Sequence, residues 1–357
     1  MAEYLGRLRP VTVVVRPIDE RCNLSCTYCN AQPYDGWGLM DEATLELLIK
    51  QASEADGVTI DFCWHGGEPL LAGKGFYQKA FQHQERWFSA GNRPRNIVQT
   101  NGLLLDKSFV AFFADHAASI GFSLDGPDVE ANRYRFRPHN AERDLQKTLD
   151  AMLLVKQAAM RLTVIMVVHD ANVDRAHDVY QFFRELGVDT LSFNPRFLRG
   201  EGPHTAGNIA PGEYAAFVDE MIALRNADRL AGGDGYSLGV ADQVHRLRTG
   251  QAVSTCFFTN RCHHFVNVNR AGECFVTCSD FVGPHIGSLQ KPGLAYILEQ
   301  LTVAPLLAVR NMLGGDYSGS STYADTIGPG CPKYSNGAGD IYIGSLLALA
   351  GQSPAST

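Results

Sequence analysis

Short apolar runs alternate with amphipathic segments along the first two thirds of the chain. These patterns predict strands at 11–15, 58–64, 96–100, 119–124, 162–168 and 190–193, and helices at 41–55, 75–89, 107–117, 145–160, 175–186 and 211–225. The first helix places Leu45, Leu48 and Ile49 on one face, and Asp41 is a suitable N-cap. This alternation predicts an α/β fold with a parallel sheet, in the form of a partial (β/α)6 TIM barrel. Residues at the carboxyl ends of its strands are then the candidates for chemistry.

The pattern changes after the stretch 232–235, which is rich in glycine and reads as a linker. Between residues 240 and 340 the predicted strands are short, and glycines and cysteines are frequent. We therefore predict two domains. The partial barrel occupies 1–235, and a small cysteine-rich domain with the C-terminal segment occupies 236–357.

The composition of the 357 residues is that of an ordinary globular protein, with 45% hydrophobic and 19% charged residues. The net charge of −7 offers no attraction for nucleic acid. The sequence contains no apolar run long enough to span a bilayer, and its first residues lack the apolar core of a signal peptide. We expect a cytoplasmic protein with neither a nucleic-acid nor a membrane partner.

Nine cysteines form two groups along the chain, with one cysteine between the groups. They are residues 22, 26, 29, 63, 256, 262, 274, 278 and 331. An odd number of cysteines without a signal peptide argues against a disulfide framework. Metal binding explains the grouping better, and it fits a reducing compartment.

The first group consists of Cys22, Cys26 and Cys29, with the spacing C-x3-C-x2-C and no fourth cysteine nearby. Thiolates select zinc, copper(I) or iron–sulfur clusters. A structural zinc site and an ordinary [4Fe–4S] site both use four protein ligands. Three thiolates on a [4Fe–4S] cluster therefore leave one iron with an open position. The alternative is a zinc knuckle or a set of core cysteines.

Polar motifs follow the second, third and fourth predicted strands. The second strand is followed by Gly66, Gly67 and Glu68, where the glycines let backbone approach a ligand and Glu68 offers a carboxylate. The third ends in Q-T-N-G at 99–102, and the fourth in S-L-D-G-P at 123–127. Each motif alone is also explained as a tight turn. Their order at successive strand ends favours one shared site.

Together these motifs resemble the radical S-adenosylmethionine (SAM) superfamily, and so does Tyr28 just before the third cysteine. The resemblance implies that SAM chelates the open iron of a [4Fe–4S] cluster. One electron then cleaves SAM to methionine and a 5′-deoxyadenosyl radical, which abstracts a substrate hydrogen. The resemblance also implies that the turn formed by Gly66, Gly67 and Glu68 contacts the amino group of SAM.

Further site residues follow from the same resemblance. It implies that Gln99 and Ser123 lie near SAM, and that Asp125 points toward the substrate or the loop backbone. An external reductant such as flavodoxin or ferredoxin would supply the electron. Arg196 follows the sixth strand and suits a carboxylate of SAM or of the substrate. A solvated loop arginine is the alternative for this residue.

The second cysteine group resembles the SPASM extension of anaerobic sulfatase maturases and of radical SAM enzymes that modify ribosomal peptides. The resemblance implies an auxiliary [4Fe–4S] cluster held by Cys256, Cys262, Cys278 and Cys331, with Cys274 as an alternative to Cys278. Cysteines for a second auxiliary cluster are missing from the sequence. Their places hold Ser318, Ser321 and Ile327. We therefore predict one auxiliary cluster.

The general base is harder to assign from the sequence. In sulfatase maturases an aspartate directly follows the third auxiliary cysteine, whereas here Ser279 stands there and Asp280 comes next. Asp280 is our candidate base, and a hydrogen-bonded turn aspartate is the alternative. Cys274, if it is not a ligand, is a candidate hydrogen-atom donor. Cys63 is expected to pack in the core.

The leading prediction is a SPASM-type maturase, a radical SAM oxidoreductase that oxidises or cross-links a residue of a peptide or protein. Only ten residues precede the first predicted strand, so we expect a leader peptide to bind the barrel or the C-terminal domain directly. The first alternative is a small-molecule radical dehydrogenase or epimerase that acts on a sugar or an aminocyclitol. The second is a non-catalytic iron–sulfur or zinc protein.

Overall fold

The computed structural model of the chain describes residues 9–29, 38–196, 207–253, 264–276, 285–303, 345–346 and 348–351. Its strands are β1 (Arg9–Val15), β2 (Val58–Trp64), β3 (Arg95–Thr100), β4 (Ser119–Ser123), β5 (Leu162–Val168), β6 (Thr190–Pro195), β7 (Phe265–Val268), β8 (Glu273–Val276) and β9 (His285–Ser288). Its α-helices are α1 (Glu42–Glu54), α2 (Lys74–Trp87), α3 (Lys107–Asp115), α4 (Ala141–Gln157), α5 (Ala176–Glu185), α6 (Pro211–Leu230), α7 (Gly239–Arg248) and α9 (Leu294–Val303). Short 3-10 helices lie at Pro69–Ala72, Ala90–Asn92 and Pro138–Asn140.

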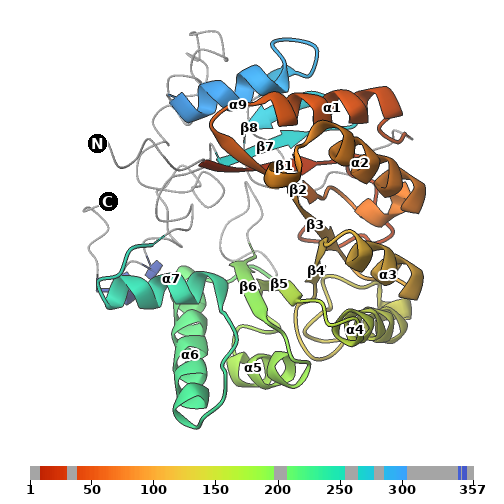
Figure 1. Cartoon of the computed structure of the whole chain (residues 1–357). Helices are drawn as coiled ribbons and strands as arrows, with labels where there is room; N and C mark the ends of the chain where they lie inside the picture. Colours follow the sequence, from red (N-terminus) through yellow and green to blue (C-terminus); the bar gives the residue numbers. More distant parts are fainter. Residues whose placement is uncertain are drawn as a thin grey trace.

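One sheet organises the described chain, with the strand order β6-β5-β4-β3-β2-β1-β7-β8-β9. Neighbouring strands from β1 to β6 pair in parallel, in sequence order. The helices α1 to α5 lie along the outer side of the curved sheet (Figure 1). The predicted α/β fold with a parallel sheet is confirmed, and the first six strands form an open, partial barrel.

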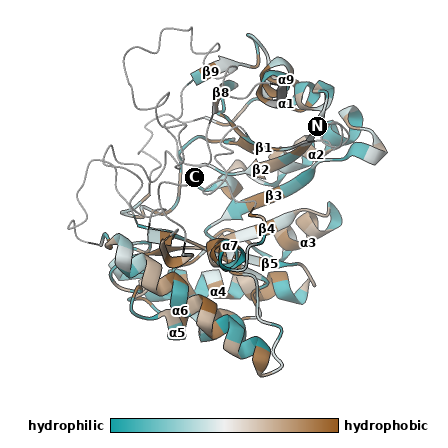
Figure 2. Ribbon diagram, turned by 90° about the vertical axis from the view of Figure 1, so that its left-hand side faces the viewer, coloured by the Kyte–Doolittle hydropathy of each residue, from teal (hydrophilic) through white to brown (hydrophobic). Residues whose placement is uncertain are grey.

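The first helix shows why the sequence pattern predicts these elements well. The Asp41 carboxylate accepts a hydrogen bond from the amide of Thr44 at 2.8 Å, which satisfies one of the amides that a helix start leaves unpaired. The side chains of Leu45, Leu48 and Ile49 are buried, as their spacing predicts. A similar mixture of hydrophobic and hydrophilic residues is visible along α6 (Figure 2). Such helices are held by packing one apolar face against the sheet.

Alternation along the strands gives the sheet two different faces. Trp64 packs edge-on against Phe76 and Tyr77 of α2, with ring centroids 5.8 and 5.7 Å apart, so its face is the one that the helices cover. Cys63 precedes Trp64 in β2 and therefore points to the opposite face. In register with Cys63 are Val14 of β1 and Ile97 of β3. This opposite face lines the inside of the partial barrel.

The strands that follow residue 253 continue the same sheet. β7 pairs with β1 in parallel, and β8 and β9 add to it in antiparallel pairs. Val266 and Val268 of β7 belong to the same buried hydrophobic cluster as Val13 and Val15 of β1. The domain division at residue 235 stays a prediction. In the described residues, however, the two predicted parts share one sheet and one core.

The structure differs from the prediction in the region expected to hold only short strands, because α7 and α9 lie there. α9 buries Leu294, Ile297, Leu298 and Leu301, which have the i, i+3, i+4, i+7 spacing of an amphipathic helix, and it contacts α1. The glycines and cysteines around this segment obscured its helical period. No helix of the described chain is both long and apolar enough to cross a membrane.

Candidate active site

The predicted site residues divide into those that the structure describes and those that it does not. Cys256, Cys262, Cys278, Cys331 and Asp280 lie outside the described residues, so the auxiliary cluster and the general base stay predictions. The other predicted residues gather at the carboxyl ends of β1 to β4. They are Cys22, Cys26, Cys29, Gly66, Gly67, Glu68, Gln99 and Ser123.

The cysteine loop follows β1 and is held by backbone hydrogen bonds. The amide of Thr27 donates to the carbonyl of Tyr134 at 2.8 Å, and the amide of Cys29 donates to the carbonyl of Cys26 at 3.0 Å. The amide of Leu24 donates to Sγ of Cys22 at 3.3 Å. The side chains of Cys22 and Cys29 are exposed, and that of Cys26 is half-buried. The loop therefore presents its thiols at the mouth of the barrel.

The three thiols lie near enough to one another to affect their titration. Burial raises the pKa of the Cys26 thiol to about 12; the Arg135 guanidinium lowers it, and the thiolates of Cys29 and Cys22 raise it further. Neighbouring thiolates repel one another in this way. They become stable ligands once a bound metal supplies positive charge. Three thiols from one loop are the donor set that a [4Fe–4S] cluster with one open iron requires.

The glycines of the turn after β2 are required by the loop that leads to Cys22. A Cβ atom on Gly67 would overlap the carbonyl oxygens of Arg21 and Glu20, and one on Gly66 would overlap the carbonyl oxygen of Asp19. The amide of Gly67 donates to the carbonyl of Asp19 at 2.9 Å. The two backbones thus pack directly on each other, and the glycines set the position of the cysteine loop.

Glu68 is completely buried, and both of its carboxylate oxygens accept hydrogen bonds. Oε1 accepts from the amide of Leu70 at 3.0 Å and from the hydroxyl of Thr100 at 2.8 Å. Oε2 accepts from the amide of Asn101 at 2.8 Å. Burial raises the pKa of Glu68 to about 7, while these hydrogen bonds favour the ionised form. The carboxylate therefore ties the end of β2 to the end of β3.

Asn101 continues this connection to the cysteine loop. Its side-chain amide donates to Oδ1 of Asn23 at 2.7 Å and lies 3.7 Å from Sγ of Cys22. The sequence motif at 99–102 contained this residue, but an asparagine before a glycine is equally well explained as a turn residue. Only the fold shows that Asn101 reaches the loop.

Gln99 and Ser123 are brought together on the inner face, as their place at neighbouring strand ends predicts. Nε2 of Gln99 donates to Oγ of Ser123 at 3.0 Å. Gln99 is in register with Gly121 of β4, where a Cβ atom would overlap the Gln99 carboxamide. Their proposed contact with SAM stays a prediction, and their contact with each other is part of the structure.

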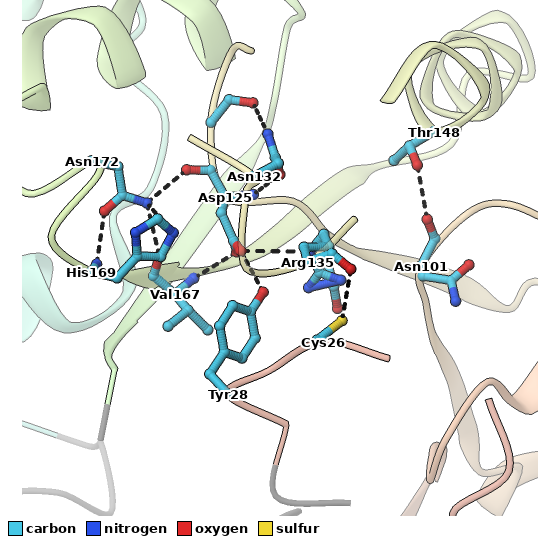
Figure 3. Close-up of polar contacts among 12 residues, drawn as sticks. Cys26, Tyr28, Asn101, Asp125, Asn132, Arg135, Thr148, Val167, His169 and Asn172 are labelled. Atoms are coloured by element: carbon cyan, nitrogen blue, oxygen red, sulfur yellow. Dashed lines mark hydrogen bonds and ion pairs between the residues drawn. The ribbon is translucent and has the colours of Figure 1, made fainter. Parts of the chain in front are cut away.

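Asp125 is a buried centre of hydrogen bonds at the ends of β4 and β5 (Figure 3). One carboxylate oxygen accepts from the amide of Val167 at 2.9 Å, and the other accepts from the hydroxyl of Tyr28. Its backbone amide donates to Asn132 at 2.9 Å, and its carbonyl accepts from Asn172 at 3.0 Å. The Asp125 carboxylate thus contacts a strand amide and the Tyr28 side chain of the cysteine loop, and its expected orientation toward the substrate or the loop backbone stays a prediction.

Arg135 joins Asp125 to the cysteine loop, and nothing in its sequence context singled it out. Its Nε lies 3.6 Å from Oδ2 of Asp125, and its guanidinium lies 5.9 Å from the Tyr28 ring. Its carbonyl oxygen lies 3.5 Å from Sγ of Cys26. Figure 3 shows Arg135 next to Cys26, and its buried positive charge lowers the pKa of the Cys26 thiol.

An aromatic layer extends from the cysteine loop toward β6. The ring of His169 stacks on Tyr28 at 6.4 Å and meets Tyr134 edge-on at 4.9 Å. Burial lowers the pKa of His169. The guanidinium of Arg196 lies 4.0 Å from the centre of the Tyr134 ring. Arg196 is buried, so the expectation of a solvated loop arginine is wrong.

Two cysteines outside the first group occupy opposite faces of the sheet. Cys63 lies on the inner face and is half-buried, whereas it was expected to pack in the core. Cys274 is paired with Val268, is completely buried and belongs to the hydrophobic core. This placement removes Cys274 from the inside of the barrel and argues against its role as a ligand or a hydrogen-atom donor.

Comparisons with known proteins show what the chain resembles in sequence and in fold. A sequence model of the Radical SAM superfamily matches residues 17–183. A serine-type anaerobic sulfatase-maturating enzyme of Bacteroides thetaiotaomicron is 30% identical over 302 residues, which are 79% of this chain and 72% of the relative. A second such enzyme, from Klebsiella aerogenes, is 33% identical over 58% of this chain and 52% of its own length.

Solved structures extend the likeness to the fold. The structure described as native anSMEcpe with bound AdoMet matches with a TM-score of 0.79 and 22% identity, over 96% of this chain and 97% of the other. The same protein with AdoMet and a Cp18Cys peptide matches with a TM-score of 0.76. At this identity the match supports the fold alone.

Proposed function

Because the chain belongs to the radical SAM superfamily and is related to anaerobic sulfatase-maturating enzymes, we propose that it is an oxidoreductase that modifies a residue of a peptide or protein. Its cofactors are a [4Fe–4S] cluster and SAM, as the superfamily implies. When bound, they supply a 5′-deoxyadenosyl radical that takes a hydrogen atom from the substrate. Oxidation or cross-linking of that residue is the proposed outcome.

The placement of the cysteine loop is the observation that carries this proposal. The loop is held on one side by the turn at Gly67 and on the other by the carbonyl of Tyr134. Asn101 fixes the start of the loop, and Arg135 stands beside its middle cysteine. Three thiols at the mouth of a partial barrel suit a cluster that must bind SAM and face a substrate. In this proposal Cys22, Cys26 and Cys29 are the cluster ligands.

The other site residues take separate roles in the proposal. The turn of Gly66, Gly67 and Glu68 contacts the amino group of SAM, and the Glu68 carboxylate also holds Asn101 in place. Gln99 and Ser123 bind SAM from the inner face. An external reductant, such as flavodoxin or ferredoxin, supplies the electron.

The C-terminal part of the proposal rests on the sequence. Cys256, Cys262, Cys278 and Cys331 hold one auxiliary [4Fe–4S] cluster, and Asp280 is the general base. The alternative of a small-molecule epimerase loses its candidate hydrogen-atom donor, since Cys274 lies in the core.

Anaerobic reconstitution tests the proposal. The wild-type protein should hold about eight irons per chain, the content of two [4Fe–4S] clusters. Under dithionite it should convert SAM to 5′-deoxyadenosine. The triple variant Cys22→Ala, Cys26→Ala, Cys29→Ala should lose about four irons and all SAM cleavage.

The control is Cys274→Ala, which removes a cysteine of the core. It should retain about eight irons and the ability to cleave SAM. SAM cleavage by the triple variant, or a wild-type protein that holds zinc and no iron, would contradict the proposal.

A further inference from the structure

The described chain buries four arginines, and one of them differs from the others. Their exposed fractions are 3% for Arg16, 7% for Arg135, 4% for Arg196 and 1% for Arg225. Three are paired with a carboxylate: Arg16 with Glu20 at 2.6 Å, Arg135 with Asp125 at 3.6 Å, and Arg225 with Asp242. Among the described residues, no carboxylate lies within ion-pair distance of Arg196.

Arg196 is held in a defined position at the end of β6. Its amide donates to the carbonyl of Val168 at 2.7 Å, and its guanidinium lies 4.0 Å from the centre of the Tyr134 ring. Gly207 covers the guanidinium from another side, where a Cβ atom would overlap Nη1 and lie 2.8 Å from the Tyr134 ring. A glycine at this position leaves room for the flat guanidinium against the tyrosine.

Two of the three nitrogens of this side chain are not satisfied by the described residues. Nε and Nη1 of Arg196 are buried and have no hydrogen-bond partner there. A buried cation without an anion is strongly unfavourable, and such groups are normally paired or bind a ligand. The guanidinium fork has the geometry to bind a carboxylate through two hydrogen bonds.

We propose that Arg196 binds a carboxylate of the substrate at the inner face of the barrel, and that the enzyme therefore selects an acidic peptide. This inference rests on the proposed function. SAM offers a carboxylate of the same chemistry, but Arg196 lies against Tyr134, which meets His169, and it is His169 that stacks on Tyr28 of the cysteine loop. The guanidinium of a different buried arginine, Arg135, lies 5.9 Å from the centre of the Tyr28 ring in the cysteine loop. The position of Arg196 thus suits the substrate better than SAM.

Matched peptides test the proposal on the reconstituted full-length enzyme. Each probe is a capped ten-residue peptide of Gly, Ser and Cys with a single Asp or Glu, and its partner carries Asn or Gln instead. The readout is the peptide concentration that half-maximally stimulates 5′-deoxyadenosine formation. The wild type should need at least about tenfold less of the acidic peptide, as expected for a desolvated charge pair.

Arg196→Met should abolish this preference, and Arg196→Lys should retain part of it because the charge remains without the fork. The control is Arg133→Met, since Arg133 is already paired with Glu130 and Asp170 on the surface. This variant should keep the preference for acidic peptides. The affinity for SAM is measured by calorimetry without peptide. If Arg196 bound the carboxylate of SAM and not that of the peptide, Arg196→Met would lower this affinity.

Three results would overturn the proposal. One is a loss of SAM affinity in Arg196→Met while the peptide preference remains, which would assign the carboxylate to SAM. Another is a lower melting temperature with the preference retained, which would assign Arg196 a structural partner. The third is a wild type that cleaves SAM but treats both peptides alike. A wild type that forms no 5′-deoxyadenosine would instead contradict the proposed function.

Discussion

Buried polar side chains hold the candidate active site together at the scale of single residues. Glu68 accepts hydrogen bonds from two backbone amides and one hydroxyl, although burial raises its pKa to about 7. Each of these bonds contributes modestly when it is made and costs more when a donor is left alone in the interior. The residue therefore matters for the position of Asn101 and of the cysteine loop more than for its charge.

Glu68→Gln should lower the free energy of unfolding by about 1–3 kcal/mol. The reason is that the NH2 group of the new side chain would face a backbone amide or hydroxyl that now donates a hydrogen bond to the carboxylate. Chemical denaturation at pH 7.5 measures this loss. Glu85→Gln is a suitable control, since Glu85 is exposed and its Oε1 lies as far as 4.0 Å from Nη1 of Arg93. Its stability should lie within about 0.5 kcal/mol of the wild type. Equal stability of the two variants would rule out the structural role assigned to Glu68.

His169 should make the protein sensitive to mild acid. Burial lowers its pKa in the folded state below the ordinary value of 6.5. Below pH 6.5 the unfolded chain therefore binds a proton that the folded chain does not, and the free energy of unfolding falls as the pH falls. Above pH 6.5 the neutral, buried His169 makes its full contribution to the free energy of unfolding.

The variant His169→Asn tests this, because its side chain can still accept the hydrogen bond from the amide of Ala171. It should be less stable than the wild type at pH 7.5, having lost the contacts with Tyr28 and Tyr134. The difference should shrink between about pH 6.5 and pH 5 in denaturation curves. A difference that stays constant over this range would show that His169 does not titrate.

At the scale of elements, one turn and one loop determine where the cluster ligands lie. The turn after β2 carries no side chain at residues 66 and 67, so the backbone at Asp19 and Arg21 lies directly against it. The amides of Gly67 and Glu68 both donate to that backbone. The position of Cys22 thus depends on contact between two loops that are more than 40 residues apart in sequence.

Gly67→Ala should displace the cysteine loop, because its methyl group would overlap backbone atoms that cannot rotate away. A displacement of this kind should lower SAM cleavage by about 100-fold. We also expect less iron per chain after reconstitution. Both quantities are measured in the same anaerobic assay.

The control for this variant is Gly75→Ala in the first turn of α2. A Cβ atom there meets no other atom within 4 Å. Alanine also favours the helix by as much as about 1 kcal/mol relative to glycine, so this variant should be equally or more stable. Equal iron content and activity in the two variants would show that the close packing at Gly67 is dispensable.

At the scale of the whole molecule, the sheet joins the two parts that the sequence pattern separates. β7 pairs with β1, whose other neighbour is β2, so the C-terminal strands protect an edge that would otherwise be open. The core is continuous across this junction. We expect the described parts to unfold together.

Val266→Ala tests this at the completely buried side chain of β7. It should lower the free energy of unfolding by about 1–3 kcal/mol and shift one common transition in circular dichroism and tryptophan fluorescence. Leu153→Ala, at an exposed position of α4, should change stability by less than about 0.5 kcal/mol. Separate transitions for the two signals would favour independent domains divided near residue 235.

Local sequence patterns determined many of the strands and helices of this protein and its candidate cluster ligands. The period of apolar residues predicted β1 to β6 and their helices. An element that buries one face must carry apolar residues at the spacing of that face, so the pattern is visible within each segment. The spacing of Cys22, Cys26 and Cys29 indicated a cluster with an open iron, since these ligands come from one short loop. The amphipathic period of α9 was equally present and was obscured by the composition around it.

The features that depend on distant segments became visible only in the fold. The pairing of β7 with β1, the contact of Gly67 with the cysteine loop, and the placement of Cys63 and Cys274 on opposite faces each need a register that no local pattern contains. The same holds for Arg196, which the sequence left equally suited to solvent or a carboxylate. Its burial without an ion-pair partner among the described residues depends on Tyr134 and Gly207, which the fold alone brings to it.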